Sequence, residues 1–235
     1  MLDERLSLAA QLYQPCALGA DIGTDHALLP CHLLTHGICQ EMILADVSPK
    51  ALLHAEESVR RYHLEDRARI RLADGLNALD APCGCVSMMG MGGETIRTVL
   101  LAGAEKLQGA VLVLSSHTEQ PLVRRTLPEI GYHIVQERLC QAAGRFYIFW
   151  RAESGLAESW TEAEQHFGRL LWTQNAPSLL ADYCRYRIKV MEDRLTGLAA
   201  ASGDVRQMRE EIAAEIAFYR AKIANMTNES EGASC

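Results

Sequence analysis

Along the first two thirds of the chain, short apolar runs alternate with stretches whose apolar residues recur every three or four positions. The runs have the length of strands, and the intervening stretches have the period of amphipathic helices. The run at 110–115 is apolar almost throughout, which is typical of a strand covered on both faces of a sheet. The pattern predicts strands at 16–21, 42–46, 68–73, 83–89 and 110–115, and helices at 2–13, 26–36, 49–61, 94–106 and 119–129.

Two further strand patterns, 132–139 and 146–151, follow each other with no helix between them. Ala143-Gly144 lies in the short connection, so the second strand is expected to turn back antiparallel to the first. Strands that alternate with helices and end in such a hairpin predict an α/β fold with a Rossmann-like, doubly wound sheet whose last strand is antiparallel.

The pattern changes near Glu153-Ser-Gly155, a polar stretch after which no segment resembles a strand. Helices are expected at 161–174, 178–198 and about 204–226, with a break at Ser202-Gly203. The last two carry apolar stripes that predict a coiled-coil-like antiparallel pair. The stripes are Leu179, Tyr183, Tyr186, Val190 and Leu198 on one helix, and Val205, Met208, Ile212, Ile216, Tyr219, Ile223 and Met226 on the other. We therefore expect two domains, a sheet domain at 1–155 and an all-helical domain at 156–235.

The bulk composition is that of a globular protein with a sizeable core, since 49% of the 235 residues are hydrophobic and 23% are charged. The net charge of −7 argues against a broad nucleic-acid-binding surface but leaves room for a local basic patch. The densest basic stretch is either a solvated surface or a set of phosphate contacts. It contains Arg60, Arg61, Arg67, Arg69 and Arg71, and smaller candidates are Arg124-Arg125 and the group Arg185, Arg187 and Lys189.

Cysteine and histidine usage gives no sign of a disulfide framework or of a metal. The eight cysteines contain no C-x-x-C pair, and Cys83-Gly-Cys85 offers only half of a zinc site. His32 and His36 lie one helical turn apart without further ligands, so no metal is expected. No apolar run reaches the roughly 20 residues that span a bilayer, and the N-terminus lacks the basic-then-apolar order of a signal peptide. We expect a cytoplasmic protein without membrane contact.

Three of the predicted strands end in an acid or are followed directly by one. Asp21, Asp46 and Asp74 lie 25 and 28 positions apart. Parallel strands bring their carboxyl ends to one edge of the sheet, where open α/β folds bind ligands. Three carboxylates there suit a ligand with hydroxyls, an amine or a positive charge. Each acid taken singly is also explained as a helix cap or a turn residue.

The turn after the first predicted strand reads Asp21-Ile-Gly23-Thr-Asp25-His26. A dinucleotide site would need the pattern G-x-G-x-x-G, with the pyrophosphate at the helix N-terminus. Only one of those glycines is present and the turn is acidic, which disfavours an NAD-dependent dehydrogenase. The pattern favours S-adenosyl-L-methionine (SAM), a nucleoside with a sulfonium and no phosphate. On this interpretation Asp46 accepts from the ribose hydroxyls and Asp74 from the adenine amino group.

Glycines follow the fourth predicted strand in the motif Gly90-Met91-Gly92-Gly93. They either leave room for a flat substrate beside the methyl donor or simply open the next helix.

Over almost its whole length, the chain resembles the bacterial tRNA (adenine-22-N1)-methyltransferase family. The resemblance is carried by Asp21-Ile-Gly-Thr-Asp-His-Ala27 with Leu29-Pro30, by Asp46, by Asp74-Gly75-Leu76, by Gly90-Met-Gly-Gly93 and by the helical tail. It implies a class I methyltransferase domain, SAM as donor, tRNA as substrate, and a tail that helps to grip the tRNA. Two departures lie near the expected entry of the base. Leu28 stands where the family usually has Tyr, and Ser115-Ser116-His117 where it usually has Gln-Pro-Asn.

The resemblance also assigns roles to individual residues. Those expected to bind the donor are Asp21, Ile22, Gly23, Thr24, Asp46, Val47, Asp74, Gly75 and Gly90. Those expected to line the substrate site are Leu28, Met91, Gly92, Gly93 and His117. Arg5 is a candidate contact for the carboxylate of the donor.

The expected chemistry needs little proton transfer. Adenine N1 already has a free lone pair, so positioning supplies most of the catalysis, and the base must turn out of the folded tRNA to reach the site. The product is cationic. Asp25 is the candidate for stabilising the charge that develops on the base, with His26 as its orienting partner.

Two other functions stay open at this point. One is a class I methyltransferase that acts on another RNA or on a small molecule, and the other is a non-catalytic relative that binds SAM or RNA. Methyl-transfer assays on total tRNA and on metabolites would separate them. Any protein partner is unknown, and a monomer or weak dimer is expected.

Overall fold

The computed structural model describes the backbone of residues 2–156, 158–198 and 205–232, with side chains through residue 226. The chain forms two compact units, and the division between them falls between Gln174 and Asn175. No helix within the described residues combines the length and the apolar composition needed to cross a bilayer.

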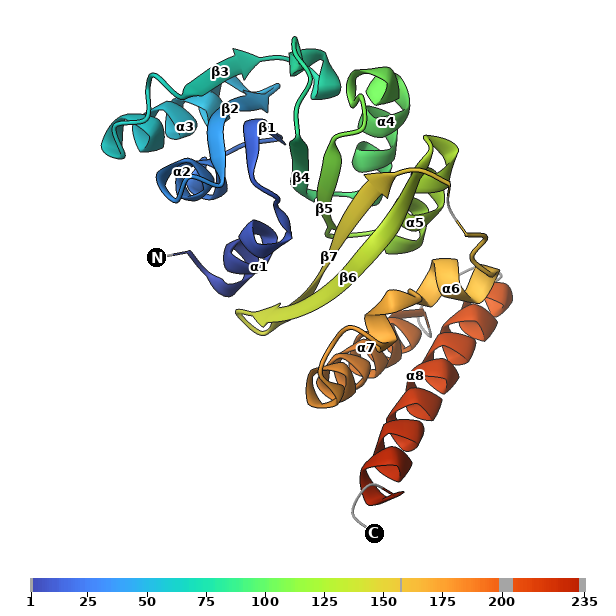
Figure 1. Ribbon diagram of the computed structural model, residues 1–235. Coiled ribbons are helices and arrows are strands. Elements are labelled where there is room, and N and C mark those ends of the chain that lie inside the picture. The colour runs from blue at the N-terminus through green and yellow to red at the C-terminus, as the bar shows by residue number, and fades with distance from the viewer. Residues whose placement is uncertain (1, 157, 199–204, 233–235) are drawn as a thin grey trace. The chain divides into compact units, whose positions relative to one another are not determined.

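A seven-stranded sheet forms the centre of the first unit, with the strand order β3-β2-β1-β4-β5-β7-β6 (Figure 1). Strands β1 to β5 are parallel, whereas β7 runs antiparallel to both of its neighbours, β5 and β6. This confirms the predicted doubly wound sheet with a reversed last strand. The strands are β1 (Cys16–Ile22), β2 (Cys39–Asp46), β3 (Ala68–Leu72), β4 (Cys85–Met91), β5 (Val111–Ser116), β6 (Tyr132–Ala142) and β7 (Arg145–Ser154).

Helices cover both faces of the sheet. Buried residues of α1, α2 and α3 share one apolar cluster with the central strands, and α4 and α5 lie together on the opposite face (Figure 1). Such two-sided cover explains why every residue of β5 is buried. The helices are α1 (Glu4–Leu12), α2 (Leu28–Thr35), α3 (Pro49–Arg61), α4 (Gly93–Gly103) and α5 (Gln120–Glu129), with short 3-10 turns η1 (Gly75–Ala78) and η2 (Ala104–Lys106).

The order of the strands creates a crevice at the carboxyl edge. After β1 the chain adds β2 and β3 on one side, and β4 then pairs with β1 on the other side. The connections therefore diverge between β1 and β4, which is where doubly wound folds bind their ligands. In register, Asp21 of β1 lies opposite Leu44 of β2 and Ser87 of β4.

The expected domain boundary after residue 155 is too early. Helix α6 (Glu162–Phe167) and the 3-10 turn η3 (Leu170–Trp172) belong to the first unit. A buried carboxylate on β6, that of Glu137, accepts hydrogen bonds from the backbone N–H groups of Leu170 and Leu171. The single helix expected at 161–174 is interrupted at Gly168, whose φ of +85° ends α6.

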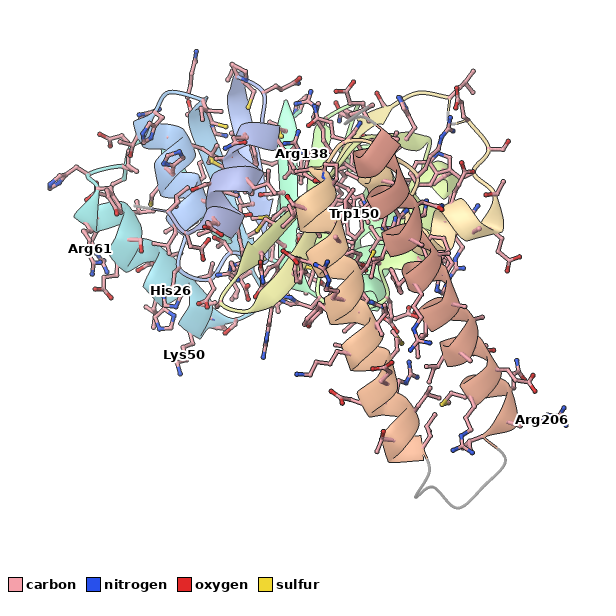
Figure 2. All side chains as sticks on the ribbon, turned by 90° about the horizontal axis from the view of Figure 1, so that it is seen from below. His26, Lys50, Arg61, Arg138, Trp150 and Arg206 are labelled. Atoms are coloured by element: carbon pink, nitrogen blue, oxygen red, sulfur yellow. The ribbon has the colours of Figure 1, made fainter. Side chains whose placement is uncertain are left out.

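The second unit is a pair of long antiparallel helices, α7 (Pro177–Leu198) and α8 (Arg206–Gly232) (Figure 2). Met191 of α7 packs with Ile212 and Ile216 of α8, and partly buried Ile188, Leu195 and Leu198 surround them. The predicted stripes are confirmed at Tyr183 and Leu198 of α7 and at Ile212, Ile216 and Tyr219 of α8. Val190 of α7 and Met208 of α8, which were also expected in the stripes, are exposed. The break expected at Ser202-Gly203 lies outside the described residues.

Candidate active site

A cavity of about 340 Å³ opens at the carboxyl ends of β1, β4 and β5. The turn between β1 and α2 forms one wall, Met89 and Gly90 of β4 and Ser115 of β5 form the floor, and α1 and β7 close the remaining side. Several residues expected at the site do line this cavity. They are Asp21, Gly23, Thr24, Asp25, His26, Leu28, Gly90 and His117.

Asp21 is the buried acid of the site, with only 7% of its surface exposed. Its Oδ1 accepts a hydrogen bond from Ser87 Oγ, and Ser87 in turn accepts one from the Tyr13 hydroxyl at 2.6 Å. Burial raises the pKa of the Asp21 carboxyl, the Ser87 hydrogen bond opposes this shift, and the nearby Asp46 charge adds to it. Burial also raises the pKa of Tyr13 well above its ordinary value, so Tyr13 stays a donor at neutral pH.

The turn after β1 is shaped by its backbone. Gly23 has a φ of +81°, and its N–H and that of Thr24 both donate to the carbonyl of Ala45 at the end of β2. Ala27 has a φ of +49°, which is uncommon for a residue with a side chain and is concentrated at functional sites. This path carries Asp25 and His26 outward to the rim of the cavity, where 60% of each side chain is exposed.

His54 joins this rim from α3. Its Nδ1 lies 3.1 Å from Asp25 Oδ1, and the rings of His26 and His54 stack with centroids 4.7 Å apart. Sequence reasoning missed His54 because 28 positions separate it from His26 and only the fold brings them together.

Asp46 and Asp74 also lie at the carboxyl edge, but neither lines the main cavity. Asp46 Oδ1 accepts from Ser48 N at 2.7 Å, so the turn role is present. A carboxylate has further lone pairs, so this bond does not exhaust Asp46 as an acceptor. Beside it, Val47 is 64% exposed. Asp74 and Gly75 line a separate hollow of about 60 Å³ between η1 and α4.

The glycine motif spans the end of β4 and the start of α4, and its glycines have different surroundings. Gly90 has a φ of +77° and lines the cavity. A Cβ on Gly93 would lie 2.7 Å from the carbonyl oxygen of Glu119, and one on Gly92 would lie 3.0 Å from Thr118 Oγ1. Met91, Gly92 and Gly93 are not among the residues that line the cavity, so their part in binding the substrate stays a prediction. The Met91 side chain lies over Gly23 instead.

Arg5 and Tyr147 form a wall of the cavity that the sequence pattern did not fully reveal. The Arg5 guanidinium is held by Asp3 and lies 5.1 Å from the centre of the Tyr147 ring, while His117 faces the same ring at 6.2 Å. Arg5 was a candidate for the site, but Tyr147 was not. Tyr147 reaches the cavity because β7 inserts beside β5, a pairing that local sequence does not specify.

Comparison with known proteins identifies the family. A family model described as a methyltransferase domain matches residues 2–149, which include every residue that lines the cavity. The chain belongs to this methyltransferase family. A tRNA (adenine(22)-N(1))-methyltransferase of Bacillus subtilis is 30% identical over 156 residues, which cover 66% of this chain and 66% of that protein.

Solved structures resemble the methyltransferase over most of its length. A Streptococcus pneumoniae protein, Sp1610, described as a candidate tRNA (m1A22) methyltransferase, has 25% identity and a TM-score of 0.84, covering 95% of this chain and 100% of that one. A second structure of Sp1610, in complex with S-adenosyl-L-methionine, has a TM-score of 0.82 at the same identity and coverage.

The arginines of the densest basic stretch of the methyltransferase make contacts within the first unit. Each arginine of the densest group contacts an acid or backbone carbonyls of its own unit, which favours a structural role. The contacts are Arg60 with Glu56, Arg61 with Glu57, Arg67 with the carbonyls of Cys39 and Gln40, Arg69 with Glu41, and Arg71 with Asp80. Arg124 is buried, so only its neighbour Arg125 is exposed to a ligand.

Proposed function

We propose that this methyltransferase transfers a methyl group from SAM to N1 of the adenine at position 22 of tRNA, in the cytoplasm. The observation that carries the proposal is the set of three acids at the carboxyl edge of β1 to β3. In addition, the turn that follows β1 lacks the glycines of a pyrophosphate site. The names of the Bacillus subtilis and Streptococcus pneumoniae proteins, and the SAM complex of the latter, support the donor and the acceptor.

The residues present fit SAM by their chemistry. SAM, when bound, supplies an electrophilic methyl group on a positively charged sulfur. Asp21 places a buried carboxylate at the cavity, and the bare backbone of Gly23 allows a ligand to approach closely. Asp46 would accept from the ribose hydroxyls, while Val47 would cover the adenine and Asp74 would accept from its amino group. Ile22, Thr24, Gly75 and Gly90 complete the set proposed for the donor.

The acceptor side of the cavity is less acidic. Leu28, His117 and Tyr147 offer an apolar surface, an imidazole and an aromatic ring at its mouth. A base turned out of a folded RNA is commonly held by stacking on such side chains. We place the target adenine against Tyr147 and His117, with Leu28 on its other side.

Asp25 is the residue that we assign to charge stabilisation. N-methylation leaves a positive charge on the adenine, and a carboxylate at the rim stabilises that charge as it develops. His26 contacts Asp25 Oδ2 at 3.5 Å and orients the carboxylate. No residue is required to remove a proton before the attack, because N1 of neutral adenine is unprotonated.

Mass spectrometry of tRNA nucleosides tests the proposal directly. Transcribed tRNA incubated with the purified chain and SAM should yield 1-methyladenosine at position 22, and a matched tRNA with guanosine at that position should yield none. A methylated product at another position would redirect the assignment of the acceptor. The absence of any methylated nucleoside in total tRNA would contradict it.

A further inference from the structure

Three side chains converge at the rim of the cavity, and the methyl-transfer reaction gives no role to one of them, His54. Asp25 lies between two imidazoles, with His54 Nδ1 3.1 Å from Oδ1 and His26 Nε2 3.5 Å from Oδ2. One ligand atom from each residue falls within 4.8 Å of the other two. Figure 2 shows His26 lying against α3, the helix that carries His54.

We propose that Asp25, His26 and His54 bind a divalent transition metal ion of the zinc class. Bonds of about 2.1 Å from one ion to nitrogen and oxygen ligands place neighbouring ligand atoms about 3.0–3.4 Å apart. The 3.1 Å between His54 Nδ1 and Oδ1 falls in that range and the 3.5 Å between His26 Nε2 and Oδ2 lies just above it, so each imidazole nitrogen is paired with a different oxygen of the Asp25 carboxylate. Two imidazoles with one carboxylate select zinc, nickel or cobalt over magnesium and calcium, which prefer oxygen ligands.

The site is open rather than closed. The exposed fractions are 60% for the side chains of Asp25 and His26 and 38% for that of His54, so protein covers only one side of the ion. Three protein ligands leave the remaining positions to water or to a small ligand from the cavity, which Asp25 and His26 also line. The two rings lie face to face with an angle of 6° between their planes, so one imidazole has to turn about its side-chain bonds before both nitrogens face the same ion.

The bound ion would compete with the use of Asp25 in methyl transfer. A carboxylate that coordinates a dication no longer offers a free negative charge to the cationic base, so the ion would inhibit the reaction. This consequence rests on the proposed function, whereas binding of the metal does not.

Calorimetric titration of the metal-free full-length chain tests the binding. Zn²⁺ is the first probe. Co²⁺ is the second, because its absorption spectrum separates nitrogen and oxygen ligands from the thiolates of the eight cysteines. We expect one Co²⁺ site without thiolate bands. His54→Asn should lower the affinity at least tenfold, as should Asp25→Asn. His63→Asn is the matched control, because His63 is exposed, has a φ of +54° that Asn tolerates, and should not alter binding.

Three results would overturn the metal site: no Co²⁺ binding to the native chain, thiolate bands in the bound spectrum, or equal affinities for the native and His54→Asn chains. Circular dichroism of each variant checks that it is folded. In the methyl-transfer assay, the Zn²⁺ concentration that inhibits the native and His63→Asn chains should be at least tenfold lower than the concentration that inhibits the His54→Asn chain. If no transfer occurs at all, the proposed function fails while the titration still decides on the metal.

Discussion

The three acids at the carboxyl edge show how burial gives one residue type different properties. Asp21 is buried and held by Ser87, Asp46 is half-buried and anchors a turn, and Asp74 is exposed at the start of a 3-10 turn. Burial raises the pKa of the Asp21 carboxyl, because a charge removed from water costs free energy unless several hydrogen bonds replace the water. Ionisation of Asp21 in the folded chain therefore costs free energy, and the carboxyl lies at the cavity despite that cost.

This cost predicts a pH-dependent effect of Asp21→Asn. Folding raises the pKa of Asp21 above 3.8, so the residue contributes stability below that pH and loses it as the pH rises through its folded-state pKa. Between about pH 4 and pH 7, the free energy of unfolding of the variant should rise relative to the native chain. The gain is roughly 1.4 kcal/mol for each unit by which folding raises the pKa. Urea unfolding across that range measures it, and a flat difference would show that burial does not penalise the charge. Asp66→Asn, at an exposed position, serves as the control.

For Asp46, in contrast to Asp21, we expect a substitution to lower the affinity for SAM. If its carboxylate accepts two hydrogen bonds from the ribose, Asp46→Ala should weaken binding of SAM at least tenfold, because charge-assisted bonds are among the strongest. Isothermal titration measures the dissociation constant. Asp66→Ala should bind as the native chain does. Unchanged affinity in Asp46→Ala would remove the ribose role and leave only the turn that Asp46 makes with Ser48.

At the scale of elements, one buried ion pair fixes the end of the first unit. Glu137 of β6 accepts from Arg124 of α5 and Trp150 of β7, each at 2.8 Å, as well as from the N–H groups of η3. Arg124 also donates to the carbonyl of His166 in α6. Two strands, two helices and a 3-10 turn thus share one set of charged hydrogen bonds.

Removing one partner of this pair should be costly. Glu137→Gln leaves the Arg124 charge buried without a counter-ion, and the free energy of unfolding should fall by about 3–5 kcal/mol. Glu153→Gln on the neighbouring strand is the matched control, since its pair with Arg151 is partly exposed and worth less than about 1 kcal/mol. Equal losses in the two variants, measured by urea unfolding, would show that the buried pair does not hold these elements together.

Helices and strands could be predicted from the sequence where a single hydrophobic periodicity runs through the segment. The parallel strands, their helices and the hairpin have local patterns, and the three acids could be placed because parallel strands end on one edge. The contributions of His54 and Tyr147 depend on which helix and strand lie next to the site, which no local pattern specifies. The substrate role expected of Gly92 and Gly93 stays a prediction, because a glycine needed for packing looks the same in sequence as one that makes room for a ligand. The same limit applied to the boundary after residue 155, since the link to Glu137 joins residues 33 and 34 positions apart.

The whole molecule divides its charge unevenly. From residue 175 onward the sequence holds eight basic and nine acidic residues, so about six of the seven net negative charges belong to the first unit. A polyanion such as tRNA meets less repulsion at the helical unit than the total charge suggests. Within the helical unit, Arg187 pairs with Glu215, and Arg220 pairs with Glu192.

Shortening the chain separates binding of the donor from binding of tRNA. A chain that ends after Gln174 keeps the cavity and the hydrogen bonds of Glu137, so it should fold and bind SAM within about twofold of the full-length affinity, since no residue of the site is lost. Its affinity for tRNA should fall at least tenfold, with a smaller salt dependence, if the helices supply phosphate contacts. A chain that ends after residue 155 lacks the N–H groups of Leu170 and Leu171 and should unfold at lower urea concentration. Filter binding at two salt concentrations and calorimetry measure these effects. If the chain of residues 1–174 bound tRNA as tightly as the full-length chain, the helical unit would have no part in recognition. Exposed Arg125 and partly buried Arg5 of the first unit would then be the next contacts to test.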